Sequence, residues 1–378
     1  MHIDKRAPLR ISVSIALVLS LSHTAQADNG FNALSDMFTY NGFGTAAFDR
    51  TDTDKAEYAR TGQTVGARTS PYFKTDSDFG LQGTVAPTDW VSGTVQLLAV
   101  DRSNNSMSLD IEWAYLKFKP VSGLAIRFGE MALPTYMISD SRYVGYANTW
   151  IRPPDEVYGQ GTFDTFHGGD IAYQYSFGKY SIAVGALAGR THGDTVVPFL
   201  GKLDLTGRSL RGYNATFDAD IVKFHYSYVR TILSVEAPPP IQLGGGPFSF
   251  SDLGVSSDHN NVMLQAEFIT RHTTSTGNNT NGWYVLGGYH FGKFLPYASY
   301  AVHQQPSGPT SPSGGWIPTL GSHTAAAGVR WDVIQNVDVK FQVDHTTKDP
   351  AAEGQFLDVQ PGFNNRATIV GIAADFVF

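Results

Sequence analysis

The last thirteen residues, Arg366–Phe378, alternate between two kinds of side chain. One face of the predicted strand carries every second residue: Thr368, Val370, Ile372, Ala374, Phe376 and Phe378. The other face carries smaller residues and the single charge of Asp375. At the edge of a soluble sheet, such an apolar strand would invite aggregation. In a closed membrane barrel it pairs on both sides and its apolar face contacts lipid. The pattern therefore predicts an all-β fold, a transmembrane antiparallel β-barrel of the outer-membrane type.

The first 27 residues have the pattern of a secretory signal peptide. Basic residues precede Ile11–Leu21, an uncharged apolar run, and the small residues of Ala25-Gln26-Ala27 follow it. This run is shorter than the roughly 20 residues that a spanning helix needs. We therefore expect cleavage of residues 1–27 and export of 28–378, the barrel domain, to the outer membrane of a Gram-negative cell.

Composition excludes several kinds of protein. The chain has no cysteine, so it can form neither disulfides nor thiolate metal sites. Removal of residues 1–27 takes three of 27 basic and one of 34 acidic residues, which leaves 24 and 33 and a net charge of −9. An acidic chain is not expected to bind nucleic acid. We expect no cofactor and no metal, and we interpret Asp49, Asp52 and Asp54 as a solvated acidic stretch rather than a calcium site.

Alternating segments joined by short turns predict a series of hairpins. Alternation of strand direction requires one further strand at 247–257, which composition alone does not reveal. The count is then even, as single-chain bacterial barrels require. The sixteen predicted strands are 40–48, 79–86, 91–101, 109–119, 124–130, 170–177, 180–190, 210–218, 222–232, 247–257, 262–271, 283–291, 294–302, 324–333, 337–347 and 366–378.

The segments between these hairpins differ at the two ends of the predicted barrel. Aromatic residues border the short turns and predict an aromatic belt on the periplasmic side. They are Phe177, Tyr180, Phe217, Phe224, Phe291, Phe294 and Trp331. Long outer loops rich in Gly, Pro, Ser, Thr and Asp are predicted at 49–77, 191–208, 234–246, 305–321 and 349–365. A barrel of this width encloses an aqueous channel.

Residues 131–167 form the longest connection and follow the fifth predicted strand. They include Met, Ile, Val, Tyr and Trp side chains, which a solvent-exposed loop would not normally carry. A segment folded into the lumen would explain both these apolar side chains and its charges. We therefore expect 131–167 to lie inside the barrel.

These features resemble the general porins of Gram-negative outer membranes, which are trimeric barrels of sixteen strands. Three segments of the loop, Ile138–Arg142, Gly145–Asn148 and Trp150–Tyr158, are similar to a porin-like subgroup. In the family, the third outer loop folds inward to form a constriction, where acidic loop residues face basic wall residues. The resemblance implies a homotrimer in contact with the lipid bilayer and lipopolysaccharide.

The resemblance also implies roles for charged residues of the loop. Asp140, Asp155 and Glu156 would form the acidic side of the constriction. Arg142 and Arg152 depart from a purely acidic pattern. They either join the constriction or pair with those acids and stiffen the loop.

Side-chain parity predicts which wall residues face the lumen. On strand 124–130 the large apolar residues face lipid, so Arg127 should face the lumen. The same argument places Arg330 inside, and these two are the predicted pore-wall residues. It also places ten other polar residues inside: Gln96, Asp170, Gln174, Lys223, His225, Gln265, Glu267, His290, Lys340 and Gln342.

Strand 109–119 resists this argument, because Glu112 and Lys117 fall on opposite faces of a regular strand. Either a β-bulge intervenes or the side that faces the lumen changes.

The sequence favours a water-filled channel for the passive diffusion of small hydrophilic solutes or ions. A channel specific for anions or small organic acids is the first alternative. An outer-membrane barrel enzyme is a weaker one, because neither a Gly-x-Ser-x-Gly elbow nor a His-Glu-x-x-His motif is present. A gated receptor or adhesin is a third. We predict no catalytic residues.

Overall fold

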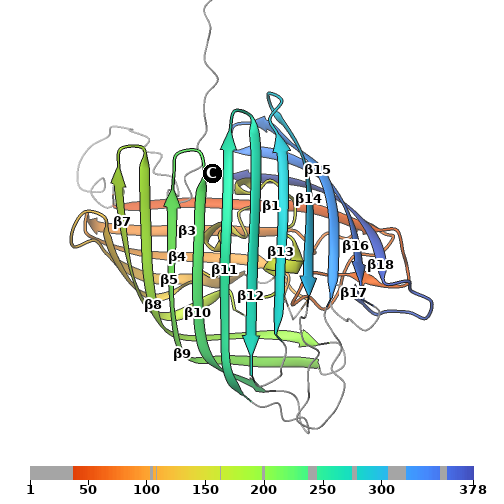
Figure 1. Ribbon diagram of the computed structural model, residues 1–378, viewed down its shortest axis with the longest axis horizontal. Coiled ribbons are helices and arrows are strands. Elements are labelled where there is room, and N and C mark those ends of the chain that lie inside the picture. Colours follow the sequence, from red (N-terminus) through yellow and green to blue (C-terminus); the bar gives the residue numbers. More distant parts are fainter. Residues whose placement is uncertain are drawn as a thin grey trace, which may run out of the picture.

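In the computed structural model, a closed antiparallel barrel of sixteen strands is formed by the described residues (Figure 1). These residues are 37–102, 105–107, 109–161, 163–197, 201–236, 245–274, 279–304, 321–349 and 356–378. Residues 1–27, the predicted signal peptide, and most of the predicted loop 305–321 lie outside them. None of the described helices is long and apolar enough to cross a membrane.

The sixteen barrel strands are β1 (Phe38–Thr51), β3 (Asp78–Thr88), β4 (Val91–Val100), β5 (Leu109–Phe118), β6 (Leu124–Ala132), β7 (Thr165–Phe177), β8 (Tyr180–Val197), β9 (Gly201–Asp218), β10 (Lys223–Glu236), β11 (Gly246–His259), β12 (Val262–Thr273), β13 (Thr280–Tyr289), β14 (Phe294–Gln304), β15 (Ser322–Ile334), β16 (Val337–Lys348) and β18 (Arg366–Val377). The connections contain five short elements: β2 (Glu57–Tyr58), β17 (Phe356–Leu357), the 3-10 helices η1 (Ser139–Ser141) and η2 (Gly145–Ala147), and the helix α2 (Asp155–Tyr158).

The strand count agrees with the sequence prediction. Each strand pairs with its neighbours in the chain, and β18 closes the ring by pairing with both β16 and β1. The strand inferred from direction alone is present as β11. On β18 the faces are as predicted, since Ile369 and Asp375 are buried inside whereas Ile372 is exposed outside.

A β-bulge resolves the exception on β5. Gln96 of β4 pairs with Trp113, but the next residue, Leu97, pairs with Ile111. Glu112 is therefore the extra residue of a bulge, which turns its side chain inward. Glu112 and Lys117 thus share the lumen side, which confirms the first of the two explanations.

The prediction of an outer loop at 191–208 is wrong. β8 continues to Val197 and β9 begins at Gly201, so the two strands extend as one long hairpin. Leu203 and Leu205 are buried on its inner face, and the polar residues alternate with them on the outside. Polar composition suggested a loop, whereas inward burial of every second residue keeps the segment paired.

The outer loops also contain a pairing that the sequence did not predict. β2 and β17, from the loops 49–77 and 349–365, form a two-stranded sheet. Tyr58 and Phe356 lie on it with ring centroids 6.3 Å apart. The sheet joins the first and last outer loops beside the seam where the barrel closes.

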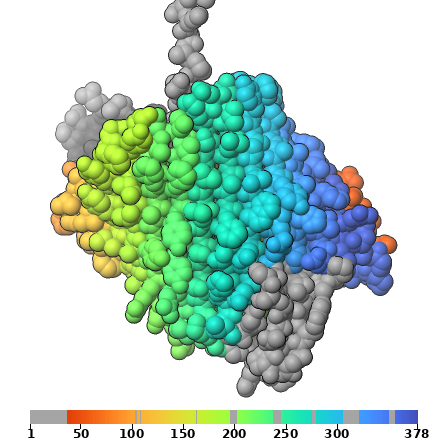
Figure 2. Space-filling view, in the orientation of Figure 1, coloured from red at the N-terminus to blue at the C-terminus, as the bar shows by residue number. Residues whose placement is uncertain are grey.

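Large apolar side chains are exposed on most strands of the outer wall, one face of which is seen as an unbroken surface in Figure 2. Aromatic side chains beside the short turns are exposed there and contact one another, as the ring pairs Phe177–Tyr180 and Phe294–Trp331 show. A wall of this kind suits contact with lipid.

Candidate functional site

The segment 131–167 crosses the lumen from β6 to the opposite wall, inside the ring of strands (Figure 1). Its helix α2 contacts β12, β13, β14 and β15, and η2 contacts β1 and β18. The prediction that this connection folds into the barrel is confirmed.

An apolar cluster attaches the loop to the inner wall. Tyr136 packs edge-on against Phe250 of β11, with ring centroids 5.2 Å apart, and Trp150 packs similarly against Tyr284 of β13. Tyr158 is completely buried beside them. The inner wall of β9–β14 is therefore apolar where the loop covers it, which explains why the loop carries so many apolar residues.

A buried carboxylate on β12 fixes the middle of the loop. Glu267 accepts hydrogen bonds from the backbone N–H of Met137, at 3.0 Å, and from the hydroxyl groups of Tyr158 and Tyr284. Charge-assisted bonds of this kind are stronger than neutral ones.

Arg152 fixes the far end of the loop. Its guanidinium pairs with Asp49 of β1, Asp344 of β16 and Asp76, whose carboxylate oxygen lies 2.6 Å from Nε. All four side chains are at least 95% buried. Arg152 also lies over the ring of Tyr58, 5.6 Å from its centroid. Arg152 therefore ties the loop to β1, to β16 and to the connection that precedes β3.

Two cations of the wall hold η2 through its carbonyl groups. Lys340 Nζ donates to the carbonyl of Gly145 at 2.7 Å. Arg330 Nη1 donates to the carbonyls of Tyr146 and Asn148 at 2.7 and 3.0 Å. A Cβ on Gly145 would overlap the Asp375 carboxylate, so η2 approaches the wall as closely as it does only because this residue is glycine.

Asp155 and Glu156 of α2 are buried in the contact between loop and wall. Asp155 accepts hydrogen bonds from the backbone and hydroxyl of Thr61, and Glu156 accepts one from Thr324 of β15 at 2.6 Å. Burial raises the pKa of Glu156 to about 7, although the Thr324 hydrogen bond opposes the rise.

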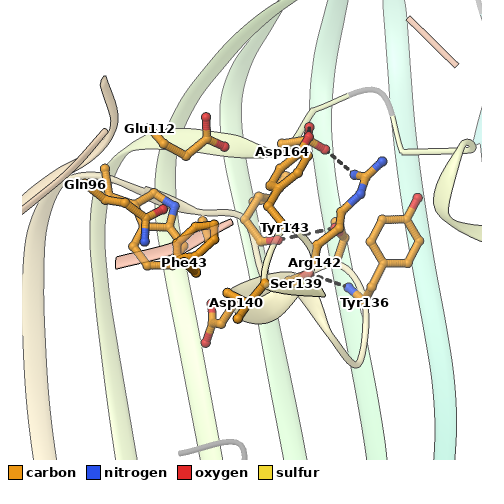
Figure 3. Close-up of a pocket in the computed structure, with 14 residues that line it drawn as sticks. Phe43, Gln96, Glu112, Tyr136, Ser139, Asp140, Arg142, Tyr143 and Asp164 are labelled. Carbon is orange, nitrogen blue, oxygen red and sulfur yellow. Dashed lines mark hydrogen bonds and ion pairs between the residues drawn. The ribbon is translucent and has the colours of Figure 1, made fainter. Parts of the chain in front are cut away.

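These contacts leave an opening between η1 and the wall formed by β4, β5 and the end of β6. Part of it is a cavity with about 420 Å³ of free space, some of it open to solvent (Figure 3). Arg142 pairs there with Asp164, whose other carboxylate oxygen accepts a hydrogen bond from Tyr143 at 2.7 Å. Burial alone would raise the pKa of Asp164, but Arg142 and Tyr143 hold it below its usual value. Across the cavity, Glu112 pairs with Arg102 at 2.6 Å.

Asp140 of η1, which also lines the opening, lies near Arg127 of β6 and Asp170 of β7. Arg127 binds Asp170 through Nε, at 3.0 and 3.1 Å from the two carboxylate oxygens, and Lys117 is its register partner on β5. Desolvation inside the barrel raises the pKa of Asp140, and Arg127 opposes that rise. Asp140 is exposed to the opening, and neither its side chain nor that of Lys117 forms a hydrogen bond or ion pair with a described residue.

The predicted site residues thus fall into two groups. Asp140 and Arg142 line the opening and Arg127 lies near Asp140, whereas Arg152, Asp155, Glu156 and Arg330 hold the loop against the wall. Arg142 and Arg152 pair with none of the three loop acids that the sequence suggested as their partners, Asp140, Asp155 and Glu156. The sequence did not indicate four residues at the opening: Tyr143 and Asp164, which line it, Arg102, which pairs with the lining residue Glu112, and Lys117, the register partner of Arg127. For Lys117 a signal was present, because a bulge on β5 places Lys117 on the lumen side together with Glu112.

No family model and no curated protein matches the chain. Solved structures do match it. The outer membrane channel DcaP of Acinetobacter baumannii is 12% identical with a TM-score of 0.59, over 90% of this chain and 97% of that one. The anion-selective porin from Comamonas acidovorans is 13% identical with a TM-score of 0.56, over 90% and 99%. The trimer form of in-vitro folded OmpT, an outer membrane protein of Vibrio cholerae, is 12% identical with a TM-score of 0.55, over 90% and 99%.

The chain has the porin fold. At such low sequence identity the structural similarity concerns the fold alone. It confirms the barrel architecture that the resemblance implied. Among the described residues, no three His, Asp or Glu side chains are arranged to hold a metal ion.

Proposed function

We propose that the chain forms a water-filled channel through which small hydrophilic solutes and ions diffuse passively across a Gram-negative outer membrane. One observation carries the proposal: the loop is held against β12–β15, β18 and β1, and between η1 and β4–β6 it leaves an opening that charged side chains line. A narrow opening of this kind excludes solutes by size, and its charges orient dipolar ones.

The charges of the opening are balanced. Among the described charged residues beside the opening, Arg127–Asp170, Arg142–Asp164 and Arg102–Glu112 form three ion pairs, and the side chains of Lys117 and Asp140 are left without one. A balanced opening supports a general channel rather than a strongly selective one.

The test is the reversal potential of single channels in a tenfold KCl gradient. The wild-type channel should have a reversal potential near zero. Asp140→Asn should shift it towards the anion value and Lys117→Gln towards the cation value, because each removes one of the two unpaired charges. Absence of any conductance would refute the channel and reopen the enzyme alternative.

A channel specific for anions or small organic acids is the second candidate. Lys117 lies beside Arg127 without an ion pair of its own, which would attract an anion. This candidate requires a wild-type reversal potential close to the anion value and loss of that preference in Lys117→Gln.

We also propose a homotrimer in contact with lipid and lipopolysaccharide, which is supported by the apolar outer wall and by the trimeric form of the Vibrio protein. Light scattering in detergent should give three subunits. Cleavage of residues 1–27 is part of the proposal, so the purified protein should begin near Asp28 by mass spectrometry.

A further inference from the structure

Four arginines gather on the outer surface of β8, β9 and β10, which run side by side in Figure 1. Arg190, Arg208, Arg211 and Arg230 are all exposed. They face outward, because residues next to them, such as Leu210 and Val229, are buried in the lumen.

A β-bulge on β9 brings two of these arginines to the same face. Arg230 of β10 pairs with Arg211 of β9. Ile232 lies two residues after Arg230, yet it pairs with Arg208, which lies three residues before Arg211. The extra residue lies at Ser209, whose φ of 57° is in the left-handed region. Without the bulge, Arg208 and Arg211 would point to opposite sides of the sheet. The same irregularity on the β8 side lies next to Arg190.

The guanidinium groups of the cluster have no partner among the described residues. None of the four forms a hydrogen bond or ion pair with a described side chain or carbonyl group. Arg211 and Arg230 are direct cross-strand partners, and like charges in that arrangement are destabilising. Two acidic residues, Asp204 of β9 and Glu236 of β10, are register partners of each other and lie several residues beyond the arginines, away from the short turn. An anion from outside the chain would relieve this repulsion.

The height of the cluster indicates where that anion comes from. Tyr213 and Tyr228, with ring centroids 5.6 Å apart, lie one dyad below Arg211 and Arg230 on the outer wall. Arg190 follows Tyr180, at the short turn, by ten residues. On a strand tilted by about 40° that distance corresponds to a height of roughly 25 Å, the thickness of the apolar band of a membrane barrel. Arg208 likewise lies ten residues from the short-turn end of β9, whereas Arg211 and Arg230 lie seven residues from the short-turn ends of their strands, a height of roughly 18 Å. Long arginine side chains can extend from that height towards the extracellular rim of the band, where Arg190 and Arg208 lie.

We propose that Arg190, Arg208, Arg211 and Arg230 bind the phosphate groups of a phosphorylated lipid headgroup in the outer leaflet. The guanidinium fork matches phosphate in shape and charge, and several forks can surround one headgroup. This inference rests on the proposed location in the outer membrane, but it does not depend on the lumen or on conductance.

The test measures binding of diphosphoryl lipid A to the detergent-solubilised protein by native mass spectrometry. Arg211→Gln with Arg230→Gln should weaken binding at least tenfold, because it removes two of the four guanidinium groups that would donate charge-assisted hydrogen bonds to the phosphates. Arg190→Gln and Arg208→Gln should each weaken it less. Arg50→Gln, which removes an exposed arginine on the far strand β1, is the matched control and should leave the affinity within twofold.

Further arms separate the sources of phosphate. Lipid A without its phosphates should bind wild type and double variant equally, and equimolar inorganic phosphate should not displace diphosphoryl lipid A. Displacement would overturn the lipid assignment in favour of a free anion. A changed subunit number in the double variant would identify the patch as a protein interface instead. Unchanged affinity in a correctly folded double variant would refute the site, whereas unaltered conductance in that variant leaves the channel function intact.

Discussion

At the scale of single residues, Arg152 places one guanidinium among three carboxylates, those of Asp49, Asp76 and Asp344. Removal of one member of a buried charge network costs about 3–5 kcal/mol, because its partners keep their charge without compensation. We therefore expect Arg152→Gln to release the far end of the loop. Limited proteolysis should cut 131–167 faster, and single-channel current should become noisier.

The matched control for this variant removes charge on both sides. Arg152→Gln combined with Asp344→Asn should restore part of the protease resistance, since one uncompensated carboxylate is gone. A double variant that is cut as fast as the single one would show that Arg152 acts through packing on Tyr58 rather than through charge.

Gly145 gives a second prediction at this scale. A methyl group there would overlap the side chains of Asp375 and Thr45, so Gly145→Ala should push η2 away from the wall. The hydrogen bond from Lys340 to Gly145 should weaken, and amide hydrogen exchange in η2 should accelerate. Ala147→Ser, at an exposed position of the same helix, is the control and should exchange like wild type.

At the scale of elements, the attachment of α2 should depend on pH. In the attached state Glu156 has a pKa of about 7, against 4.5 when it is free. Between pH 4.5 and pH 7, Glu156 is protonated in the attached state but ionised when it is free. Its contribution to the attachment of α2 is therefore complete below pH 4.5 and is lost as the pH rises to 7. The difference between the two pKa values corresponds to about 3 kcal/mol. Hydrogen exchange of residues 155–159 should therefore be faster at pH 8 than at pH 5.

Glu156→Gln tests this mechanism, because the amide keeps the acceptor for Thr324 but cannot titrate. Once corrected for intrinsic exchange, its protection should be the same at pH 5 and pH 8. If the variant keeps the pH dependence of wild type, another group is responsible.

The elements themselves were largely predictable. Alternation and turn residues are local properties, so they located the strands and, through direction, the hidden strand β11. They failed at 191–208, where polar outward residues concealed the long hairpin of β8 and β9. They also missed β2 and β17, since two-residue strands that pair across 300 residues leave no periodicity.

At the scale of the whole molecule, the loop serves both as obstruction and as part of the core. Replacement of residues 135–160 by a short Gly/Ser linker should widen the opening and raise single-channel conductance severalfold. It should also expose Phe250, Val229 and Leu210 to water, which costs about 25 cal/mol per Å² of apolar surface. The barrel should therefore remain strand-rich by circular dichroism but unfold at lower temperature. Unchanged conductance would contradict the assignment of the loop as the constriction.

The sequence by itself determined the number of barrel strands, the side that most of them turn to the lumen and the burial of residues 131–167, because a period of two and the composition of one segment are local. Only the tertiary structure decided which charges line the opening. Arg152 and Asp140 look equivalent in sequence, yet one is buried among carboxylates 76–192 residues away and the other is exposed to the opening. Such partners meet only when the barrel closes, and no local pattern records which wall the loop will contact.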